Sequence, residues 1–248
     1  MENIYQKLIW TDDLVNKFWN FETNHKGTDE RWFTYQVGRG ILNFVNNKLS
    51  IANRVVLDYG AGKGFLVHDL INSGSKVQAL EFSNDGFSHL ENRFRNQSNF
   101  LGTILVETLP SSIPSNSVDV VFLVEVIEHL LDSYYESTFD EIFRVLKPEG
   151  YLIVTTPNDE NLFDNTICCP NCLNYFHMMQ HVRSFSRDSL KDFLLSQGFL
   201  NVKSYCTNFA NYNTNSFTNR LRRFKEKLSK SKSPHLIGIA QKPSKLST

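Results

Sequence analysis

The chain of 248 residues is 41% hydrophobic and 21% charged, an ordinary composition for a soluble globular protein. Its formal net charge is zero, which gives no global positive field to attract nucleic acid, and no apolar run reaches the roughly 18 residues of a membrane span. The N-terminal segment contains acids and has no signal-peptide core. We therefore expect a cytoplasmic protein whose cysteines are thiols or metal ligands rather than disulfides.

Residues 1–50 read as an N-terminal helical cap, and residues 51–248 read as one domain in which strand and helix patterns alternate. The predicted strands cover 54–60, 76–83, 102–107, 118–126, 151–158, 201–209 and 235–242, and the predicted helices cover 65–74, 85–96, 137–150 and 188–199. This order predicts an α/β fold, a doubly wound and mostly parallel seven-stranded sheet with helices on both faces. Ligands of such sheets bind at the carboxyl ends of the strands.

Two insertions interrupt the alternation. Residues 159–185 follow the fifth strand and are rich in Cys and His. Residues 209–233 are basic, with seven Lys or Arg and one Glu between 216 and 232. Helical spacing places Phe217, Leu221, Phe224 and Leu228 on one face of this second insertion. It is either a solvated helix or an amphipathic segment, 217–232, that makes peripheral contact with an anionic membrane or an acidic partner.

The first strand ends in a loop that points to a nucleoside ligand. Its pattern, D-x-G-x-G-x-G from Asp58 to Gly64, is neither the dinucleotide fingerprint nor a P-loop. The glycines allow close backbone approach, but the Asp58 carboxylate disfavours a pyrophosphate and favours a cationic or hydroxyl-rich ligand. Glu81 ends the next strand and can accept hydrogen bonds from both ribose hydroxyls. Together these features favour S-adenosylmethionine, the alternative being a helix-capping Asp58 and a solvated Glu81.

From about residue 54 to 209 the sequence resembles the Rossmann-like S-adenosylmethionine-dependent methyltransferases. The resemblance is carried by "VLDYGAGKG", the acid in "ALEFS", "EVIEHL", "LKPEGYLIVTTPN" and "FLLSQGF", and it is strongest to the small-molecule branch that includes ubiquinone-type O-methyltransferases. It implies that the glycine loop contacts the methionine part, that Glu81 holds the ribose, and that "VETLP" borders the adenine. The cofactor-binding residues implied are Asp58, Gly60, Ala61, Gly62, Gly64, Glu81, Phe82, Glu107, Thr108, Leu109 and Glu125.

The candidates for the acceptor side come from "EVIEHL" and from the first insertion. Glu125, Glu128 and His129 share one face of a helical turn, so His129 is a candidate general base oriented by either acid. The competing interpretation is that His129 packs against the cofactor and Glu128 caps a helix. His181 is the second candidate on this side. The E-x-x-E-H pattern also resembles the metal motif of small-RNA 2′-O-methyltransferases, with His177 or His181 as the further histidine.

The first insertion has the ligand types of a zinc site. Cys169, Cys172, His177 and His181 form two closely spaced pairs, and zinc takes four such ligands tetrahedrally. The segment resembles a Cys-x-x-Cys insertion found in some members of this methyltransferase group. The alternatives are that Cys168 or Cys206 replaces one ligand, or that the segment is a metal-free lid over the active site whose His181 faces the chemistry.

These observations predict an enzyme that transfers a methyl group from S-adenosylmethionine to a small-molecule, sugar or lipid-linked acceptor, with oxygen favoured. The alternatives are a metal-dependent RNA 2′-O-methyltransferase and a catalytically silent binding module with this fold. The aromatic residues of the cap either pack it onto the sheet or form a wall over the acceptor; they are Trp10, Phe18, Trp19, Trp32, Phe33 and Tyr35.

Overall fold

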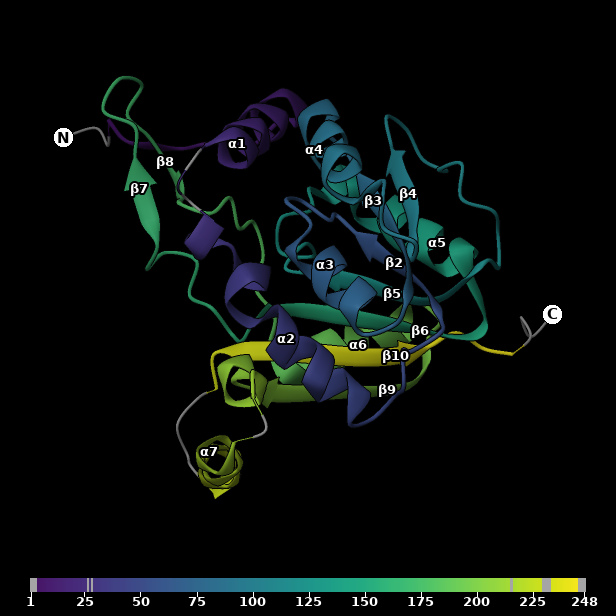
Figure 1. Ribbon diagram of the computed structural model, residues 1–248. Helices are drawn as coiled ribbons and strands as arrows, with labels where there is room; N and C mark the ends of the chain where they lie inside the picture. Colours follow the sequence, from purple (N-terminus) through teal and green to yellow (C-terminus); the bar gives the residue numbers. More distant parts are fainter. Residues whose placement is uncertain (1–3, 26, 28, 215, 229–232, 245–248) are drawn as a thin grey trace.

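The computed structural model describes residues 4–25, 27, 29–214, 216–228 and 233–244, with only the backbone for 217, 224 and 226–228 (Figure 1). A seven-stranded sheet runs through its centre in the order β4-β3-β2-β5-β6-β10-β9, and all pairs are parallel except those of β10. The strands are β2 (Val55–Tyr59), β3 (Lys76–Glu81), β4 (Phe100–Leu105), β5 (Val118–Val124), β6 (Leu146–Pro157), β9 (Leu200–Thr207) and β10 (His235–Gln241). The predicted fold class is confirmed.

Helices cover both faces of this sheet because successive strand residues point to opposite sides. Val56 belongs to the core on one face and Leu57 to the core on the other, and both are fully buried. The first face is covered by α2 (Phe33–Asn46), α3 (Phe65–Asn72) and α4 (Asn84–Phe94), and the second by α5 (Asp132–Val145) and α6 (Arg187–Ser196). The sheet is therefore a middle layer between two apolar cores.

The predicted helix over 137–150 is wrong at its C-terminal end. The structure ends α5 at Val145, and β6 begins at the next residue. Leu146 is extended, fully buried and paired with Val118, so it belongs to the sheet rather than to the helix. Burial of this side chain at the strand position outweighs the helical pattern that runs through it.

Within the predicted cap, the two helices lie in different places. α2 contributes Ile41 and Val45, both fully buried, to the core of the sheet. α1 (Asp12–Asn24) instead contacts α4 at the edge of the molecule, where Asn24 donates to the Asp85 carboxylate at 2.7 Å. The boundary at residue 50 between a cap and a second domain stays a prediction.

The first insertion forms a small second sheet with the N-terminal segment. β7 (Thr166–Cys168) and β8 (Asn174–His177) are an antiparallel hairpin, and β1 (Gln6–Lys7) pairs in parallel with β8. Figure 1 shows this hairpin beside α1, away from the main sheet. The N-terminus and the insertion, distant in sequence, are therefore joined above the carboxyl ends of the central strands.

The basic insertion begins with the short 3-10 helix η2 (Phe209–Tyr212) and continues as α7 (Phe217–Leu228), which lies below β9 in Figure 1. Leu221 is 45% exposed, whereas the side chains of Phe217, Phe224 and Leu228 lie outside the described residues. Peripheral membrane contact through 217–232 therefore stays a prediction. Among the described residues no helix combines the length and the apolar character needed to cross a membrane.

Candidate functional site

The glycine loop after β2 needs a glycine at each of its three glycine positions. Gly60, Gly62 and Gly64 all have positive φ, at 80°, 52° and 74°. A Cβ on Gly62 would lie 2.7 Å from the Trp32 ring, and a Cβ on Gly64 would lie 2.5 Å from the ring of Phe94 on α4. At these positions the backbone has a conformation that residues other than glycine rarely adopt, and the neighbouring atoms leave no room for a side chain.

Asp58 is the penultimate residue of β2 and is 2% exposed. Burial, together with the charge of Glu81, raises the pKa of Asp58 from 3.8 to about 8. Its Oδ2 atom has no hydrogen-bond partner among the described residues. A buried, unpartnered carboxylate oxygen beside a glycine loop fits a cationic ligand group, because such a group would supply the missing interaction.

Glu81 lies at the carboxyl end of β3, the strand next to β2. Its carboxylate accepts backbone hydrogen bonds from Gly62 at 2.9 Å, from Phe82 at 2.9 Å and from Ser83 at 3.2 Å. Burial raises the pKa of Glu81, and these hydrogen bonds oppose that rise. The predicted ribose-binding acid is thus attached directly to the glycine loop.

The remaining predicted cofactor residues line the same edge of the sheet. Ala61 is 8% exposed in the glycine loop, and Phe82 is 42% exposed with its ring 5.7 Å from that of Tyr59. Glu107 and Thr108 are exposed just after β4, and Leu109 is half-buried. Parallel register brings these strand ends together, since Glu81 pairs with Leu105. The structure therefore gathers the predicted cofactor residues, which are spread from 58 to 125.

Glu125 and Glu128 are a buried pair of acids after β5. Glu125 has a φ of 51° and accepts a hydrogen bond from Thr155 Oγ1 at 2.8 Å. Burial raises its pKa to about 8, and burial with the charge of Glu125 raises the pKa of Glu128 well above its ordinary value. Neither carboxylate oxygen of Glu128 has a hydrogen-bond partner among the described residues. We expect this pair to hold at least one proton at neutral pH.

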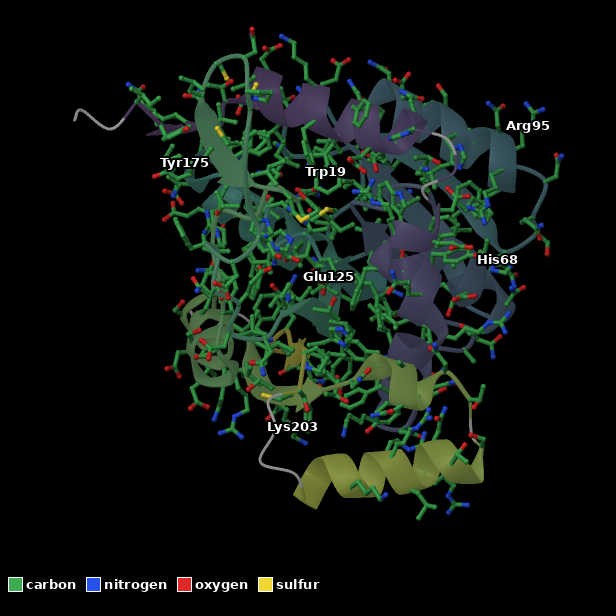
Figure 2. All side chains as sticks on the ribbon, turned by 90° about the vertical axis from the view of Figure 1, so that its left-hand side faces the viewer. Trp19, His68, Arg95, Glu125, Tyr175 and Lys203 are labelled. Carbon is green, nitrogen blue, oxygen red and sulfur yellow. The ribbon has the colours of Figure 1, made fainter. Side chains whose placement is uncertain are left out.

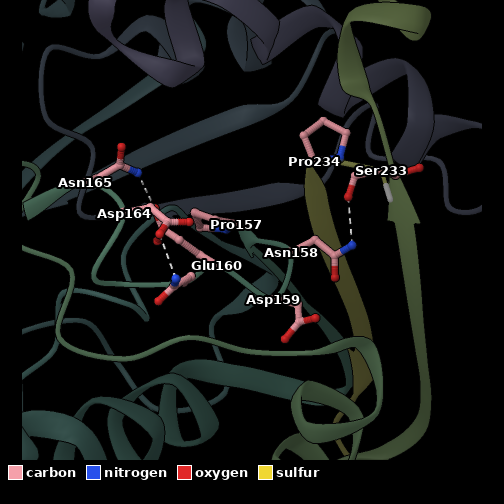
Figure 3. Close-up of a pocket in the computed structure, with 9 residues that line it drawn as sticks. Pro157, Asn158, Asp159, Glu160, Asp164, Asn165, Ser233 and Pro234 are labelled. Carbon is pink, nitrogen blue, oxygen red and sulfur yellow. Dashed lines mark hydrogen bonds between the residues drawn. The ribbon is translucent and has the colours of Figure 1, made fainter. Parts of the chain in front are cut away.

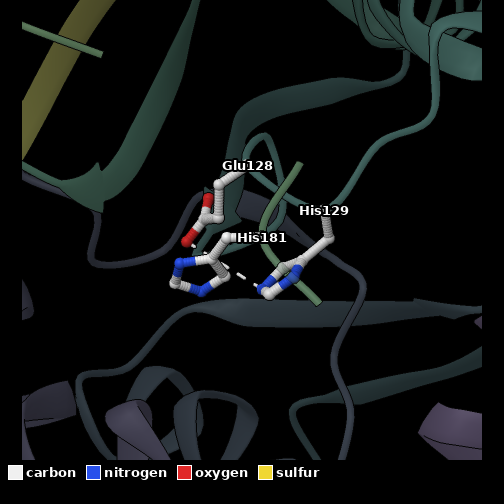
Figure 4. A group of neighbouring side chains, drawn as sticks. All are labelled: Glu128, His129 and His181. Atoms are coloured by element: carbon white, nitrogen blue, oxygen red, sulfur yellow. Dashed lines mark ion pairs between the residues drawn. The ribbon is translucent and has the colours of Figure 1, made fainter. Parts of the chain in front are cut away.

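His129 lies beside these acids and beneath α1. Its Nε2 is 3.9 Å from Glu128 Oε1, and its ring is 4.8 Å from that of His181 (Figure 4). Its ring is also 4.8 Å from that of Trp19 on α1. Burial, and then the charge of His181, lowers its pKa well below the ordinary value. His129 is therefore a neutral imidazole at physiological pH, with Nδ1 unpartnered among the described residues.

His177 and His181 face one carboxylate, that of Glu160. Their rings are stacked, with centroids 4.2 Å apart. His181 Nδ1 is 2.5 Å from Glu160 Oε2, and His177 Nε2 is 3.3 Å from Glu160 Oε1. Burial alone would raise the pKa of Glu160, but the hydrogen bond from His181 and the charges of both histidines lower it overall.

The predicted zinc ligands are not brought together. Cys169 and Cys172 lie at the turn of the β7–β8 hairpin, whereas His177 pairs with Thr166 at its other end. Cys169 follows Thr166 by three residues, a distance of roughly 10 Å along the strand. The groups of possible ligands among the described residues combine His181 with Glu128 and His129, or with Glu160 and His177, without a cysteine. Zinc held by Cys169, Cys172, His177 and His181 is therefore not supported.

The N-terminal segment covers the site through residues that the sequence motifs did not single out. Trp19 donates to Gln180 Oε1 at 2.9 Å, and Gln180 in turn donates to the His129 carbonyl at 2.9 Å. Lys63 in the glycine loop reaches Asp29 at 3.0 Å. Among the aromatic residues of the cap, Trp19 contacts His129 and Trp32 lies against Gly62, whereas others pack elsewhere, such as Phe33 on Phe209. A wall over the acceptor stays a prediction. Figure 2 shows this face of the molecule, with Trp19 and Glu125 labelled.

A polar cavity of about 340 Å³ opens at the carboxyl end of β6 (Figure 3). Its lining is Pro157, Asn158, Asp159, Glu160, Asn161, Asp164, Asn165, Ser233 and Pro234. Glu160 therefore borders this cavity and contacts His181 at the same time. Glu160 was not among the predicted residues, although the rule that strand ends carry the site applies to β6 as it does to β5.

Comparison with known proteins agrees with this geometry. Residues 57–154 match the family model described as "Methyltransferase domain". This part of the chain is therefore similar to methyltransferase domains, and the sheet has the Rossmann-like arrangement. The 1,6-didemethyltoxoflavin-N1-methyltransferase of Burkholderia thailandensis, solved with its substrate and S-adenosylhomocysteine, superimposes with a TM-score of 0.65 at 15% identity. That superposition covers 96% of this chain and 93% of the other, and it shows the shared fold.

Two curated relatives match more locally. A "Probable S-adenosylmethionine-dependent methyltransferase" of Mycolicibacterium smegmatis is 34% identical over 107 residues, which cover 43% of this chain and 39% of that protein. A ubiquinone biosynthesis O-methyltransferase of Psychrobacter cryohalolentis is 26% identical over 162 residues, which cover 58% of this chain and 60% of that protein. The chain thus aligns with less than two thirds of the length of either relative.

Proposed function

We propose that this chain transfers the methyl group of S-adenosylmethionine to an oxygen atom of a small-molecule, sugar or lipid-linked acceptor. The observation that carries the proposal is the buried Asp58 carboxylate, whose Oδ2 has no hydrogen-bond partner, at the base of a glycine loop with positive φ at each glycine. A dinucleotide would bring a pyrophosphate close to that carboxylate. S-adenosylmethionine instead has a positively charged sulfonium and a positively charged ammonium group, and such groups are attracted to the Asp58 carboxylate.

The residues at the strand ends fit the other parts of the cofactor. The glycine loop allows the methionine part to approach the backbone. Glu81 accepts hydrogen bonds from the ribose hydroxyls, which replace some of those that it now accepts from the amides of Gly62, Phe82 and Ser83. Phe82 and the segment 107–109 border the adenine. The cofactor supplies the methyl group as an electrophile: the bond from sulfur to carbon breaks as the bond from oxygen to carbon forms.

A hydroxyl acceptor loses its proton during this transfer, so a nearby neutral imidazole serves the reaction. His129 and His181 are the two candidate imidazoles, and their rings lie 4.8 Å apart. The raised pKa values of Glu125 and Glu128 reduce the negative charge beside them. Trp19 and Trp32 cover the site and limit the access of water, which would otherwise compete as an acceptor.

The preference for oxygen rests on the ubiquinone biosynthesis O-methyltransferase among the curated relatives. The Burkholderia enzyme with the same fold is an N1-methyltransferase, so the fold by itself is compatible with either atom. The buried imidazoles support oxygen further, because a hydroxyl needs a proton acceptor whereas many amines attack with a free lone pair.

Isothermal titration of the full chain with S-adenosylmethionine and S-adenosylhomocysteine tests the cofactor part of the proposal. We expect Glu81→Gln to weaken both ligands by about ten- to a hundredfold, because hydrogen bonds to a charged carboxylate are lost. Asp119→Asn is the matched control: Asp119 lies at the opposite end of β5 and is paired with Lys147 at 2.7 Å. Absence of binding by folded wild-type protein would leave a silent binding module.

One grouping of side chains favours the RNA alternative, because single ligand atoms of Glu128, His129 and His181 lie within 4.8 Å of one another. The complete burial of Glu128 and the zero net charge of the chain count against it. RNA methylation requires binding that weakens steeply with salt and activity that depends on an added divalent ion. Salt-insensitive activity on small acceptors in the presence of a chelator would exclude it.

A further inference from the structure

Glu160 is the residue that links the first insertion to the end of the central sheet. It follows β6 by three residues, is 16% exposed at its side chain, and lines the polar cavity. Its two carboxylate oxygens approach different histidines, Oε2 meeting His181 Nδ1 at 2.5 Å and Oε1 meeting His177 Nε2 at 3.3 Å. Asn165 donates to Oε1 from the cavity side at 3.2 Å.

The hydrogen-bond partners determine where the protons of these rings are. Its lowered pKa keeps Glu160 ionised at neutral pH, and an ionised carboxylate only accepts hydrogen bonds. His181 must therefore carry its proton on Nδ1, which faces Glu160. In His177 the Nδ1 atom accepts from the backbone amides of Met179 at 3.3 Å and His181 at 3.2 Å, so its proton is on Nε2, again toward Glu160.

In its neutral form, His181 with its Nδ1 proton directed at Glu160 has its lone pair on Nε2, the nitrogen that Glu160 does not occupy. The ring of His181 lies beside His129 and Glu128, on the side of the site where the acceptor must bind (Figure 4). The described groups that face His181 are Glu160, His177, His129 and Glu128, and among them only Glu160 forms a hydrogen bond with its ring. His129 is buried to about the same degree, and its Nδ1 has no hydrogen-bond partner among the described residues.

We infer that Glu160 is a positioning residue that fixes the tautomer of His181, so that Nε2 of His181 is the proton acceptor for the methyl acceptor's hydroxyl. This inference rests on the proposed function. The arrangement follows the logic of a catalytic histidine oriented by a carboxylate, where the acid fixes the ring and its tautomer but does not itself take the proton. During transfer the hydroxyl proton moves to His181 Nε2 as its oxygen bonds to the methyl carbon, and the imidazolium is stabilised by Glu160.

The test is the ring nitrogen spectrum of the full chain labelled with ¹⁵N-histidine, recorded at about pH 8 where imidazoles are neutral. Long-range ¹H–¹⁵N correlations distinguish the two tautomers of each ring, and His181→Gln and His177→Gln assign the signals. We expect His181 protonated on Nδ1 and His177 protonated on Nε2. We expect Glu160→Gln to change the tautomer ratio of His181 by about tenfold or more, because a charged hydrogen bond is replaced by a neutral one.

Asp164→Asn is the control, because Asp164 lines the same cavity but pairs with Asn161 instead of a histidine. It leaves both tautomers unchanged if the inference holds. A wild-type spectrum with His181 protonated on Nε2 overturns the inference without any variant, and so does an unchanged ratio in folded Glu160→Gln. Titration of the same samples with S-adenosylmethionine distinguishes failure of this inference from failure of the proposed function. If the wild-type protein does not bind the cofactor, the proposed function is refuted, whatever the tautomers are.

Discussion

The cofactor edge and the first insertion are built in opposite ways. At the cofactor edge, Asp58 and the glycines lie within seven residues of one loop, and Glu81 joins them through the strand next to β2. In the insertion, Glu160, just after β6, meets His177 at the end of β8 and His181 beyond it. Trp19 from the N-terminal segment lies beside them, bonded to Gln180. A contiguous loop leaves a motif in the sequence, whereas a site assembled by tertiary contacts leaves isolated residues without a pattern.

The largest expected effect concerns the buried carboxyl group of Asp58 at the cofactor edge. The pKa of Asp58 is about 8 in the folded chain against 3.8 ordinarily, so the folded state binds this proton more tightly than the unfolded state. The protonated Asp58 carboxyl group therefore contributes fully to the free energy of unfolding below about pH 4. This contribution is lost as the pH rises to about 8. We expect Asp58→Asn to abolish this loss, which has an upper limit on the order of 5 kcal/mol.

Urea unfolding of both proteins at several pH values measures this difference. The gain in the free energy of unfolding of Asp58→Asn over the wild type should grow from pH 5 to pH 8. A gain that is the same at both ends would show that Asp58 is ionised throughout in the folded protein. In the wild type, the cofactor's positive charge should also displace the Asp58 proton, visible as proton release during titration in buffers of different ionisation enthalpy.

A middle-sized effect is expected where the N-terminal segment joins the insertion. Gln180 is fully buried, accepts from Trp19 and donates to the His129 carbonyl. Gln180→Leu removes both hydrogen bonds and leaves the Trp19 N–H and the His129 carbonyl without a partner. We therefore expect a loss of about 1–3 kcal/mol in the free energy of unfolding. Gln197→Leu, at the half-buried C-cap of α6, is a matched change of the same side-chain type. Equal losses for both variants would show that the bridge contributes nothing specific.

The smallest effect is expected at the hairpin turn. Cys172 is exposed and Cys169 half-buried, and both lie away from His177 and His181. The double variant Cys169→Ser/Cys172→Ser should change the melting temperature and cofactor affinity by amounts near the error of measurement, since surface substitutions usually stay within about 0.5 kcal/mol. Stoichiometric zinc that disappears in this variant would contradict the expectation and restore the cysteines as ligands.

Most strands and helices of the main sheet could be predicted from the sequence, because each depends on a local hydrophobic pattern. Seven strands and four helices between them lie near their predicted positions. The exceptions are α5, which begins at Asp132 and ends at Val145 where 137–150 was predicted, and β6, which begins at the buried Leu146 instead of at residue 151. The hairpin β7–β8 and its pairing with β1 were not foreseen. Short strands in a polar insertion carry no clear alternation, and a partner strand more than 160 residues away leaves no local signal.

The sequence by itself determined the α/β frame, the glycine loop and the two acids that follow β2 and β3, because hydrophobic periodicity and turn glycines report directly on backbone conformation. Only the tertiary structure decided that Asp58 is unpartnered, that Trp32 lies against Gly62, and that Glu160 rather than a cysteine meets His181. These facts depend on which side chains come to share a small volume, and composition and spacing along one chain do not specify that.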